Sequence, residues 1–353
     1  MVEPDFSDAL VLTGGGTGGH YFPAVALAEG ARQRWPGRSI AFVGARRGIE
    51  ATKLPESPWP HLLLDVEGFL GRSPAKALRS LGKLWRATRH LRRLFKAGRP
   101  WAVVGTGGYA AAPALLAARS LGIPYFLHES NAAPGSLVKL LAGRARRVWC
   151  GMEAAQPRLS GANCRIVGTP VRVGFRRDFA TLDRLQPPFR LLVMGGSGGA
   201  RALNEALAGI SAELLDRHPE RQILHQTGAA ETAWERHPRH SCTPFIDEVD
   251  RALEAASLVL CRAGAATCAE LRACGRPAVL VPLPTSAGDH QRLNAMAMAS
   301  EGRAVLVEQG EGFASRLGLA LEGLLSSASR RLELSRPERN SAVADCLDDL
   351  GAL

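Results

Sequence analysis

Short apolar runs alternate with longer amphipathic stretches along the whole chain. Most of these runs are continuously hydrophobic, which is typical of parallel strands covered on both faces. We predict strands at 9–13, 39–43, 102–104, 125–127, 147–150, 164–167, 190–194, 222–226, 258–261, 278–281 and 304–307. Helices are predicted between them, for example at 23–35, 74–96 and 202–217. This order predicts a doubly wound α/β architecture with parallel sheets.

A weak internal repeat divides this pattern into two halves. Leu10–His20 reads LVLTGGGTGGH and Leu191–Arg201 reads LLVMGGSGGAR, each an apolar strand, a glycine-rich turn and a helix start. A chain of 353 residues has the length of two domains, and the repeat predicts two similar Rossmann-like domains in tandem. We place the first domain at 1–167, completed by a helix at about 338–353, and the second at 168–337.

Charge is distributed unevenly between the two halves. With 46% hydrophobic and 22% charged residues, the composition is globular and excludes a disordered or fibrous chain. Residues 1–175 hold 24 basic and 10 acidic residues, net +14, whereas residues 176–353 hold 20 and 23, net −3. The positive excess predicts an anionic partner for the first half.

The remaining composition favours a cytoplasmic protein. The seven cysteines are odd in number and include no C-x-x-C pair, so neither a disulfide framework nor a zinc site is predicted. The acidic start MVEPDF is unlike a signal peptide. The uncharged stretch 100–118 is broken by three glycines and Pro113, so we predict a strand, a turn and a helix there rather than a membrane span.

Glycine-rich turns are the first candidate binding elements. Such a turn after a strand exposes backbone N–H groups at a helix N-terminus, where the helix dipole favours a phosphate. Further turns follow the strands at 102–104 and 258–261, and all of them are expected to face the crevice between the domains. None of these turns is a Walker motif or a good G-x-G-x-x-G, which argues against a P-loop nucleotidase and a dinucleotide oxidoreductase.

Two polar positions lie next to these turns. His20 follows the first turn, where the helix N-terminus keeps the imidazole neutral and able to act as a general base; a helix-terminal residue without chemistry is the alternative. Residues 128–131, HESN, follow the predicted strand 125–127. They are either crevice residues or an ordinary turn with a helix N-cap.

Taken together, these segments resemble the MurG family of glycosyltransferase family 28. The motifs that carry the resemblance occur in family order: GGGTGGHYFPA (14–24), GTGGYAAAP (105–113), HESNAAPG (128–135), GTPVR (168–172), GGSGGARALN (195–204), FIDE (245–248), CRAGAATCAE (261–270) and DHQRLNA (289–295). The resemblance implies a GT-B fold, in which two Rossmann-like domains face a central cleft. It also implies an inverting N-acetylglucosamine transferase that uses UDP-GlcNAc and needs neither cofactor nor metal. The acceptor would be the C4 hydroxyl of MurNAc in undecaprenyl-pyrophosphoryl-MurNAc-pentapeptide (lipid I), and the product lipid II for peptidoglycan synthesis.

The resemblance also implies residue roles. His20 would be the catalytic base. The acceptor would be bound by Thr17, Gly18, Gly19, Gly107, Gly108 and Tyr109. The donor UDP-GlcNAc would be bound by Asn131, Arg172, Ser197, Ile246, Ala265, Ala266, Thr267, Glu270 and Gln291. The sequence departs from the family pattern at Ser130, Gly198 and His290, where relatives often carry Gln, and Gly198 puts one donor contact in doubt.

A basic amphipathic stretch lies between Arg72 and Arg99. It contains ten basic residues and no acidic one, with leucines and aromatic residues at helical spacing. This pattern suits the anionic cytoplasmic face of a bacterial inner membrane. The predicted membrane-associating residues are Lys76, Arg79, Leu81, Lys83, Leu84, Trp85 and Arg86. A solvated helix face and a nucleic-acid site are alternatives, but no nucleic-acid motif is present. For the activity, the alternatives are another GT-B UDP-sugar transferase or a UDP-GlcNAc epimerase.

Overall fold

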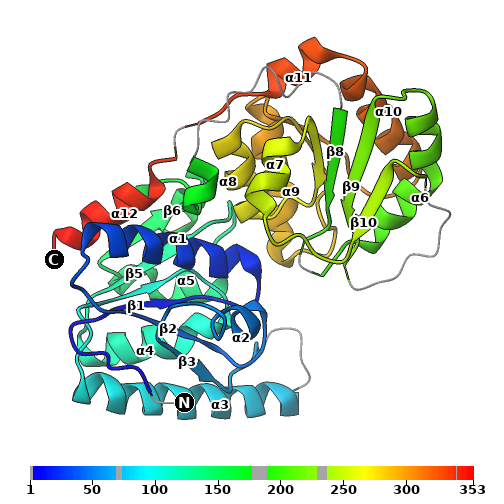
Figure 1. Cartoon of the computed structure of the whole chain (residues 1–353). Helices are drawn as coiled ribbons and strands as arrows, with labels where there is room; N and C mark the ends of the chain where they lie inside the picture. Colours follow the sequence, from blue (N-terminus) through cyan, green and yellow to red (C-terminus); the bar gives the residue numbers. More distant parts are fainter. Residues whose placement is uncertain (1–2, 69–73, 177–188, 197, 229–236, 339) are drawn as a thin grey trace. The chain divides into compact units, whose positions relative to one another are not determined.

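The protein is described by a computed structural model that covers residues 3–68, 74–176, 189–196, 198–228, 237–338 and 340–353. The chain divides into two compact units: Met1–Arg172 with Asn340–Leu353, and Val173–Arg339. Each unit holds its own parallel sheet (Figure 1).

The first unit is built on seven parallel strands in the order β3–β2–β1–β4–β5–β6–β7 (Figure 1). The strands are β1 (Leu10–Thr13), β2 (Ile40–Ala45), β3 (His61–Leu64), β4 (Ala102–Gly105), β5 (Tyr125–Glu129), β6 (Arg147–Cys150) and β7 (Cys164–Ile166). The helices are α1 (Gly18–Arg34), α2 (Ile49–Lys53), α3 (Pro74–Ala97), α4 (Ala112–Leu121), α5 (Ser136–Leu141) and α12 (Ala342–Gly351).

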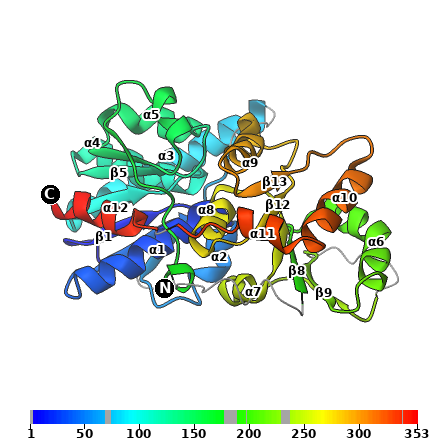
Figure 2. The ribbon, with the colours of Figure 1, turned by 90° about the horizontal axis from the view of Figure 1, so that it is seen from above.

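Alternate residues of each strand enter the cores on opposite faces of this sheet. Leu10 and Leu12 of β1 pack with residues of α1 and α12, whereas Val11 packs with residues of α3 and α4. Helix α12 lies beside α1 (Figures 1 and 2), and the Trp149 indole donates a 2.7 Å hydrogen bond to Asp349 of α12. The last helix therefore covers one face of the first sheet.

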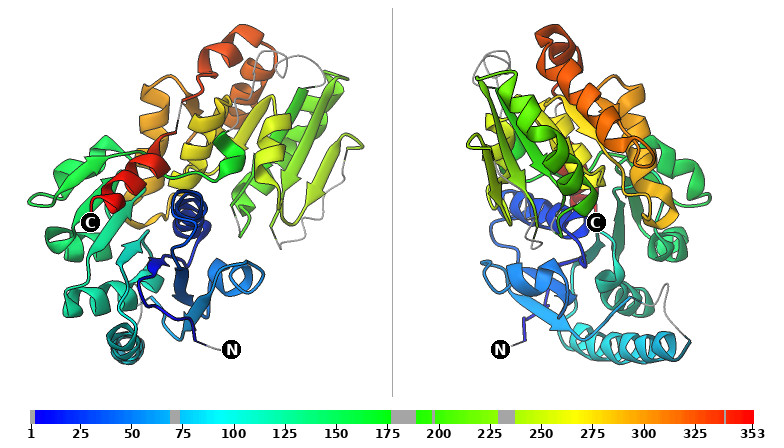
Figure 3. Two further views of the ribbon diagram at one scale, coloured as in Figure 1. Left: turned by 60° about the vertical axis from the view of Figure 1, so that its left-hand side comes forward. Right: turned by 90° about the vertical axis from the view of Figure 1, so that its right-hand side faces the viewer.

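The second unit repeats this arrangement with six parallel strands in the order β10–β9–β8–β11–β12–β13. Its strands are β8 (Phe189–Met194), β9 (Arg221–Gln226), β10 (His240–Thr243), β11 (Leu258–Cys261), β12 (Ala278–Leu280) and β13 (Ala304–Leu306). Its helices are α6 (Arg201–Asp216), α7 (Val249–Ala255), α8 (Ala265–Cys274), α9 (His290–Ser300), α10 (Phe313–Leu325) and α11 (Ala328–Leu334). Helices α6 and α10 pack together over one face of the sheet (Figure 3).

The doubly wound parallel architecture predicted from the apolar runs is confirmed. Strand β1 pairs with β2 and β4, and β8 likewise pairs with β9 and β11, so the glycine-rich turns follow equivalent central strands. Two strands were not predicted, β3 and β10, and both lie at a sheet edge. None of the described helices has the length and apolar character needed to cross a bilayer.

Candidate active site

His20 is the third residue of α1, directly after the first glycine-rich turn. Its Nδ1 lies 3.0 Å from the backbone carbonyl oxygen of Thr106, at the end of β4. Because a carbonyl only accepts hydrogen bonds, Nδ1 carries a proton, and in the neutral form of the ring Nε2 is the basic nitrogen. The Thr106 hydroxyl donates a 2.6 Å hydrogen bond back to the His20 carbonyl. Thr106 therefore sets both the position and the tautomer of His20.

Glycine is required where the turn after β4 meets His20. Gly107 has a φ of +105°, and a Cβ there would lie 2.6 Å from His20 Nδ1. A side chain would thus be strained in its backbone and would also displace the imidazole. The next residues, Gly108 and Tyr109, continue this turn, and the Tyr109 ring lies close to Gly16 of the first turn. The structure brings together the two turns that contain the predicted acceptor-binding residues.

The first turn is held from inside the unit by Glu50, which the sequence did not identify. Glu50 of α2 is fully buried, and its Oε2 accepts a 2.8 Å hydrogen bond from the Gly16 N–H. Its Oε1 accepts one of 3.3 Å from the Ala45 N–H. Burial raises the pKa of this carboxyl. The only sequence signal was an acidic residue shortly after the glycines at 44 and 48.

A second buried histidine follows at the end of β5. His128 Nε2 lies 3.0 Å from the Gly168 carbonyl, so it donates there and Nδ1 accepts from the Ser130 hydroxyl at 3.2 Å. Burial lowers the pKa of His128 to about 4, with the hydrogen bond to the Gly168 carbonyl acting in the opposite direction. His128 is therefore neutral at pH 7, and Ser130, which departs from the family pattern, is part of its support.

The neighbouring Glu129 orients Asn131. Its Oε1 accepts hydrogen bonds from the backbone N–H of Asn131 at 2.9 Å and from the side-chain amide at 3.1 Å. Its Oε2 accepts from the Gly135 N–H, where α5 begins, at 2.8 Å. Glu129 is buried and was not predicted as a site residue, although it lies inside the HESN motif.

Arg172 is the last residue of the first unit before the chain enters the second. Its guanidinium lies over the Phe22 ring, 4.4 Å from the ring centroid. This cation–π contact places the predicted diphosphate-binding arginine against α1.

In the second unit, the glycine-rich turn after β8 is tied to the end of β9. Gln226 donates a 2.8 Å hydrogen bond to the Gly196 carbonyl, and the Gly199 N–H donates to the same oxygen at 2.9 Å. Gly198, where relatives often carry Gln, is exposed. The predicted donor residue Ser197 lies outside the described residues.

The other predicted donor residues of the second unit lie near the N-termini of α7, α8 and α9. Ala265, Ala266 and Thr267 form the first turn of α8 after the extended Gly264, so their N–H groups lack helical partners. Glu270 is buried one turn later, and Ile246 is buried just before α7. In α9, Gln291 Oε1 accepts a 3.0 Å hydrogen bond from the Leu283 N–H.

Helix α3 presents an apolar stripe on its outer face. Leu78, Leu81 and Trp85 are 72%, 49% and 61% exposed, and their spacing puts them on one side of the helix. The predicted basic residues Lys76, Arg79 and Arg86 are exposed beside them. Two of the predicted membrane-associating residues are not freely exposed like the others. Leu84 is half-buried, and Lys83 Nζ lies 3.0 Å from both Asp65 and Glu67.

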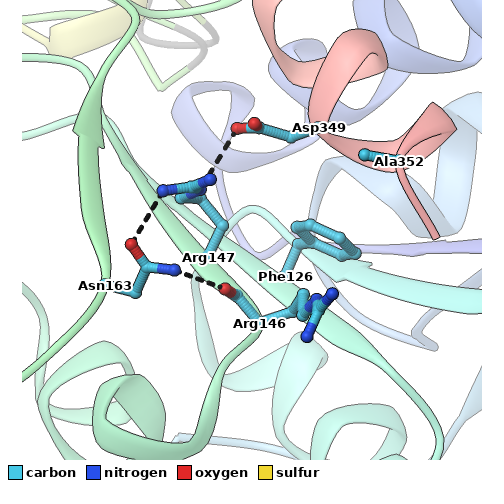
Figure 4. A pocket seen from close by; sticks show the side chains of 6 residues that line it. All are labelled: Phe126, Arg146, Arg147, Asn163, Asp349 and Ala352. Atoms are coloured by element: carbon cyan, nitrogen blue, oxygen red, sulfur yellow. Dashed lines mark hydrogen bonds and ion pairs between the residues drawn. The ribbon is translucent and has the colours of Figure 1, made fainter.

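A cavity of about 300 Å³ lies elsewhere in the first unit (Figure 4). Phe126, Arg146, Arg147, Asn163, Asp349 and Ala352 line it. Arg147 begins β6, so the cavity is at the amino ends of the strands, at the opposite edge from the glycine-rich turns. One of its two arginines, Arg147, is already paired, because it lies 3.4 Å from Asp349 and 2.7 Å from Asn163. The cavity is not part of the candidate site.

Two parallel α/β units share one strand order apart from the additional edge strand β7, and each has a glycine-rich turn after its central strand, which is the architecture of the GT-B fold. Residues 10–150 match the glycosyltransferase family 28 N-terminal domain and residues 190–350 the family 28 C-terminal domain. The chain is 39% identical to a UDP-N-acetylglucosamine–N-acetylmuramyl-(pentapeptide) pyrophosphoryl-undecaprenol N-acetylglucosamine transferase from Syntrophotalea carbinolica. The match covers 96% of each of the two chains.

Solved structures agree with this assignment. The crystal structure of Acinetobacter baumannii MurG is 28% identical, with a TM-score of 0.72, over 98% of this chain and 100% of that one. Os79 from O. sativa, solved in complex with UDP, shares the fold at 14% identity and a TM-score of 0.70, covering 98% and 100%. The chain belongs to glycosyltransferase family 28 and, within it, to the MurG family.

Proposed function

We propose that this chain transfers N-acetylglucosamine from UDP-GlcNAc to the C4 hydroxyl of MurNAc in lipid I and so makes lipid II. The activity is that of the MurG family to which the chain belongs. The observation that carries the chemistry is the pair of hydrogen bonds between His20 and Thr106. In the neutral imidazole they leave Nε2 as the basic nitrogen, next to two glycine-rich turns, which is the arrangement of a general base beside an anion-binding site.

The transfer is a single displacement with inversion. His20 Nε2 takes the proton of the acceptor hydroxyl while the hydroxyl oxygen forms a bond to C1 of the donor sugar. The bond from C1 to the UDP oxygen breaks, and UDP leaves with the electron pair. The acceptor pyrophosphate is held by backbone N–H groups of Thr17, Gly18 and Gly19, with Gly107, Gly108 and Tyr109 beside the reacting sugar.

The second unit and the adjoining residues bind the donor. The negative charge that develops on UDP is stabilised by N–H groups of Ala265, Ala266 and Thr267 at the start of α8, by the turn containing Ser197, and by Arg172. These groups supply positive potential without a divalent ion. Buried Glu270 accepts hydrogen bonds from the ribose, Ile246 presents its backbone to uracil, and Gln291 and Asn131 contact the sugar hydroxyls.

The outer face of α3 attaches the enzyme to the anionic cytoplasmic face of the bacterial inner membrane. Leu78, Leu81 and Trp85 form an apolar stripe with exposed lysine and arginine residues on its flanks. Such a stripe enters the headgroup region while the basic residues contact anionic lipids. This surface brings the active site to a substrate whose undecaprenyl chain lies in the bilayer. Lys83 contributes little because it already pairs with Asp65 and Glu67.

The test is a transfer assay with radiolabelled UDP-GlcNAc and a soluble lipid I analogue. We expect one labelled disaccharide product with inverted configuration at C1. Incubation with UDP-GlcNAc alone is the control, and it should leave the donor unchanged. A folded protein that yields no disaccharide would refute the proposal, and an epimerised sugar in the control would assign the chain to the epimerases instead.

A further inference from the structure

Five buried polar residues cluster at the carboxyl end of β9, and four of them have no role in the proposed transfer. They are His225, Gln226 and Thr227 at the end of β9, Asn204 in the first turn of α6, and His240 at the start of β10. Apart from Gln226, which already binds the glycine-rich turn, they form a chain of hydrogen bonds.

The donor and acceptor roles in this chain of hydrogen bonds are fixed at its Asn204 end. The Asn204 side-chain NH₂ lies 2.9 Å from the Thr227 carbonyl, which only accepts, so Asn204 Oδ1 faces His225 Nε2 at 3.0 Å and must accept from it. His225 Nδ1 then accepts from His240 Nε2 at 3.2 Å. Burial, followed by the nearby His240 charge, lowers the pKa of His225 to about 3. His225 is therefore neutral at pH 7, and each of these donors meets an acceptor.

The Asn204 end of this chain touches the glycine-rich turn at residues 195–200. Gly199, with φ +73°, packs so closely on β9 that a Cβ there would lie 2.4 Å from the Thr227 carbonyl. That carbonyl is the oxygen to which Asn204 donates. The Thr227 carbonyl is therefore the point where these segments meet, because Asn204 of α6 donates to it and Gly199 of the turn packs against it. His225 links this point to β10.

We infer that His225 is a positioning residue that holds the described part of the glycine-rich turn, residues 195–196 and 198–200, in the shape that binds the diphosphate of the nucleotide sugar. It does not touch the donor. It fixes Asn204, and Asn204 fixes the backbone against which the turn packs. The inference rests on the proposed function, because it takes UDP-GlcNAc as the ligand of this turn.

Cys242 raises a different interpretation, since His225, His240 and Cys242 lie close enough together to bind a metal ion. Among the described residues, no other group of three histidine, cysteine or acidic residues has such spacing. The hydrogen-bond geometry favours the hydrogen-bonded chain over a metal site. A metal bound by His225 and His240 would occupy the lone pairs that the 3.2 Å hydrogen bond uses, whereas Asn204 already determines the tautomer of His225.

Two amide substitutions separate the two sides of His225. A glutamine amide reaches the position of Nε2, so His225→Gln keeps the donor to Asn204 and loses the acceptor for His240. An asparagine oxygen reaches the position of Nδ1, so His225→Asn does the reverse. His218→Gln, at a half-buried histidine of the same unit that pairs with Glu322, is the matched control.

We expect His225→Asn to raise the Kd for UDP and the KM for UDP-GlcNAc about tenfold, with kcat and the acceptor KM within about threefold of the parent. His225→Gln and His218→Gln should leave both constants within about threefold. A purely structural role would lower the melting temperatures of both His225 variants and leave UDP affinity alike in the two.

The overturning results are equal donor affinity in His225→Asn and His225→Gln, or about one zinc ion per purified chain that is lost in His240→Ala and Cys242→Ser. UDP binding, measured by calorimetry, also separates this inference from the proposed function. The parent protein could bind UDP, and His225→Asn could bind it more weakly than His225→Gln, while none of them transfers sugar. In that case the proposed function fails and the role of His225 stands.

Discussion

The two glycine-rich turns follow equivalent strands of equivalent sheets, but different chemistry supports them. The first turn rests on the carboxyl group of Glu50, which is buried and ionisable. The second rests on neutral groups: the amide of Gln226 and, through Thr227, the chain that contains Asn204 and His225.

This difference fits the ligands that we assign to the two turns. The second turn would meet the diphosphate of the donor, where charge grows during the reaction, and a buried carboxylate nearby would oppose that growth. Neutral amides and imidazoles hold the backbone at no electrostatic cost. The first turn rests instead on a carboxyl whose pKa is raised by burial. The two turns are thus supported by different side chains: a buried carboxyl in the first unit, and amides and an imidazole in the second.

The largest effect is expected at His20, which has no counterpart in the second turn. His20→Ala should lower kcat by about 10²–10⁴-fold, the usual contribution of a general base, with the KM for UDP-GlcNAc nearly unchanged. Steady-state transfer kinetics measure both constants. His90→Ala removes a histidine of the same unit that pairs with Glu3 and should have no effect. A His20→Ala enzyme with more than a tenth of parental kcat would remove His20 as the base.

The two units should also differ in membrane binding. Replacing Leu81 and Trp85 by serine should weaken binding to vesicles containing anionic lipid by about tenfold to a hundredfold, because the apolar area that these side chains bury in the bilayer is lost. Co-sedimentation at several lipid concentrations measures this. Leu319→Ser, at a position 75% exposed in the second unit, is the control and should bind like the parent. Equal loss in both variants would contradict a membrane surface on α3.

The buried His128 predicts a stability change with pH in the first unit. Its folded pKa of about 4 lies below the unfolded value, so unfolding takes up a proton between about pH 6.5 and 4. The stabilisation is complete above pH 6.5 and falls by about 3 kcal/mol as the pH drops to 4. Glu50, with a raised pKa, acts in the opposite direction.

Urea unfolding followed by tryptophan fluorescence measures this loss. Five of the six tryptophans belong to the first unit, so the signal reports mainly on it. His128→Gln keeps a donor for the Gly168 carbonyl and removes the titrating ring. It should flatten the pH dependence; an unchanged slope in this variant would show that His128 is not its source.

Glu50 offers a direct way to break the support of the first turn. Glu50→Ala leaves the buried N–H groups of Gly16 and Ala45 without their acceptors, which should cost about 1–3 kcal/mol in unfolding free energy. The acceptor KM should rise while the donor Kd stays constant. Glu56→Ala, which removes an exposed carboxylate paired at 3.7 Å with Lys53, is the control. A rise in donor Kd of equal size would contradict separate support of the two turns.

The smallest effect distinguishes two basic residues on α3. Arg79→Gln should weaken vesicle binding about fivefold, since each basic residue near an anionic surface contributes roughly 1 kcal/mol. Lys83→Gln should change it by less than twofold, because Lys83 already contacts Asp65 and Glu67. The same co-sedimentation assay at two salt concentrations measures both. Equal effects would show that these carboxylates do not hold Lys83.

Central strands were readable from the sequence because both of their faces are buried. The continuous apolar run at β11, LVLC, gave its bounds without error. The edge strand β10 reads HSCT and has no such run, because an edge strand is covered less completely. Its pairing with β9 comes from tertiary structure and not from its own composition.

The parts of the candidate site that were predictable are those where glycines in a motif allow backbones to approach closely, as in the turns around His20 and Gly107. It was not predictable where single buried polar side chains connect distant segments. Glu50 reaches Gly16, and His225 reaches both Asn204 and His240, across different elements. Periodicity carries no signal for such pairings, and only the folded structure brings the partners together.

The return of α12 to the first unit has a consequence during synthesis. The apolar residues Val343, Cys346, Leu347 and Leu350 of α12 complete the core beside α1. The ribosome translates them only after the whole second unit, Val173–Arg339. Translation proceeds at about 5–20 residues per second, so the apolar side of α1 in the nascent first unit stays uncovered for roughly ten to thirty seconds. Chaperones that bind emerging chains should therefore recognise α1 most strongly in this interval, before the last helix leaves the exit tunnel.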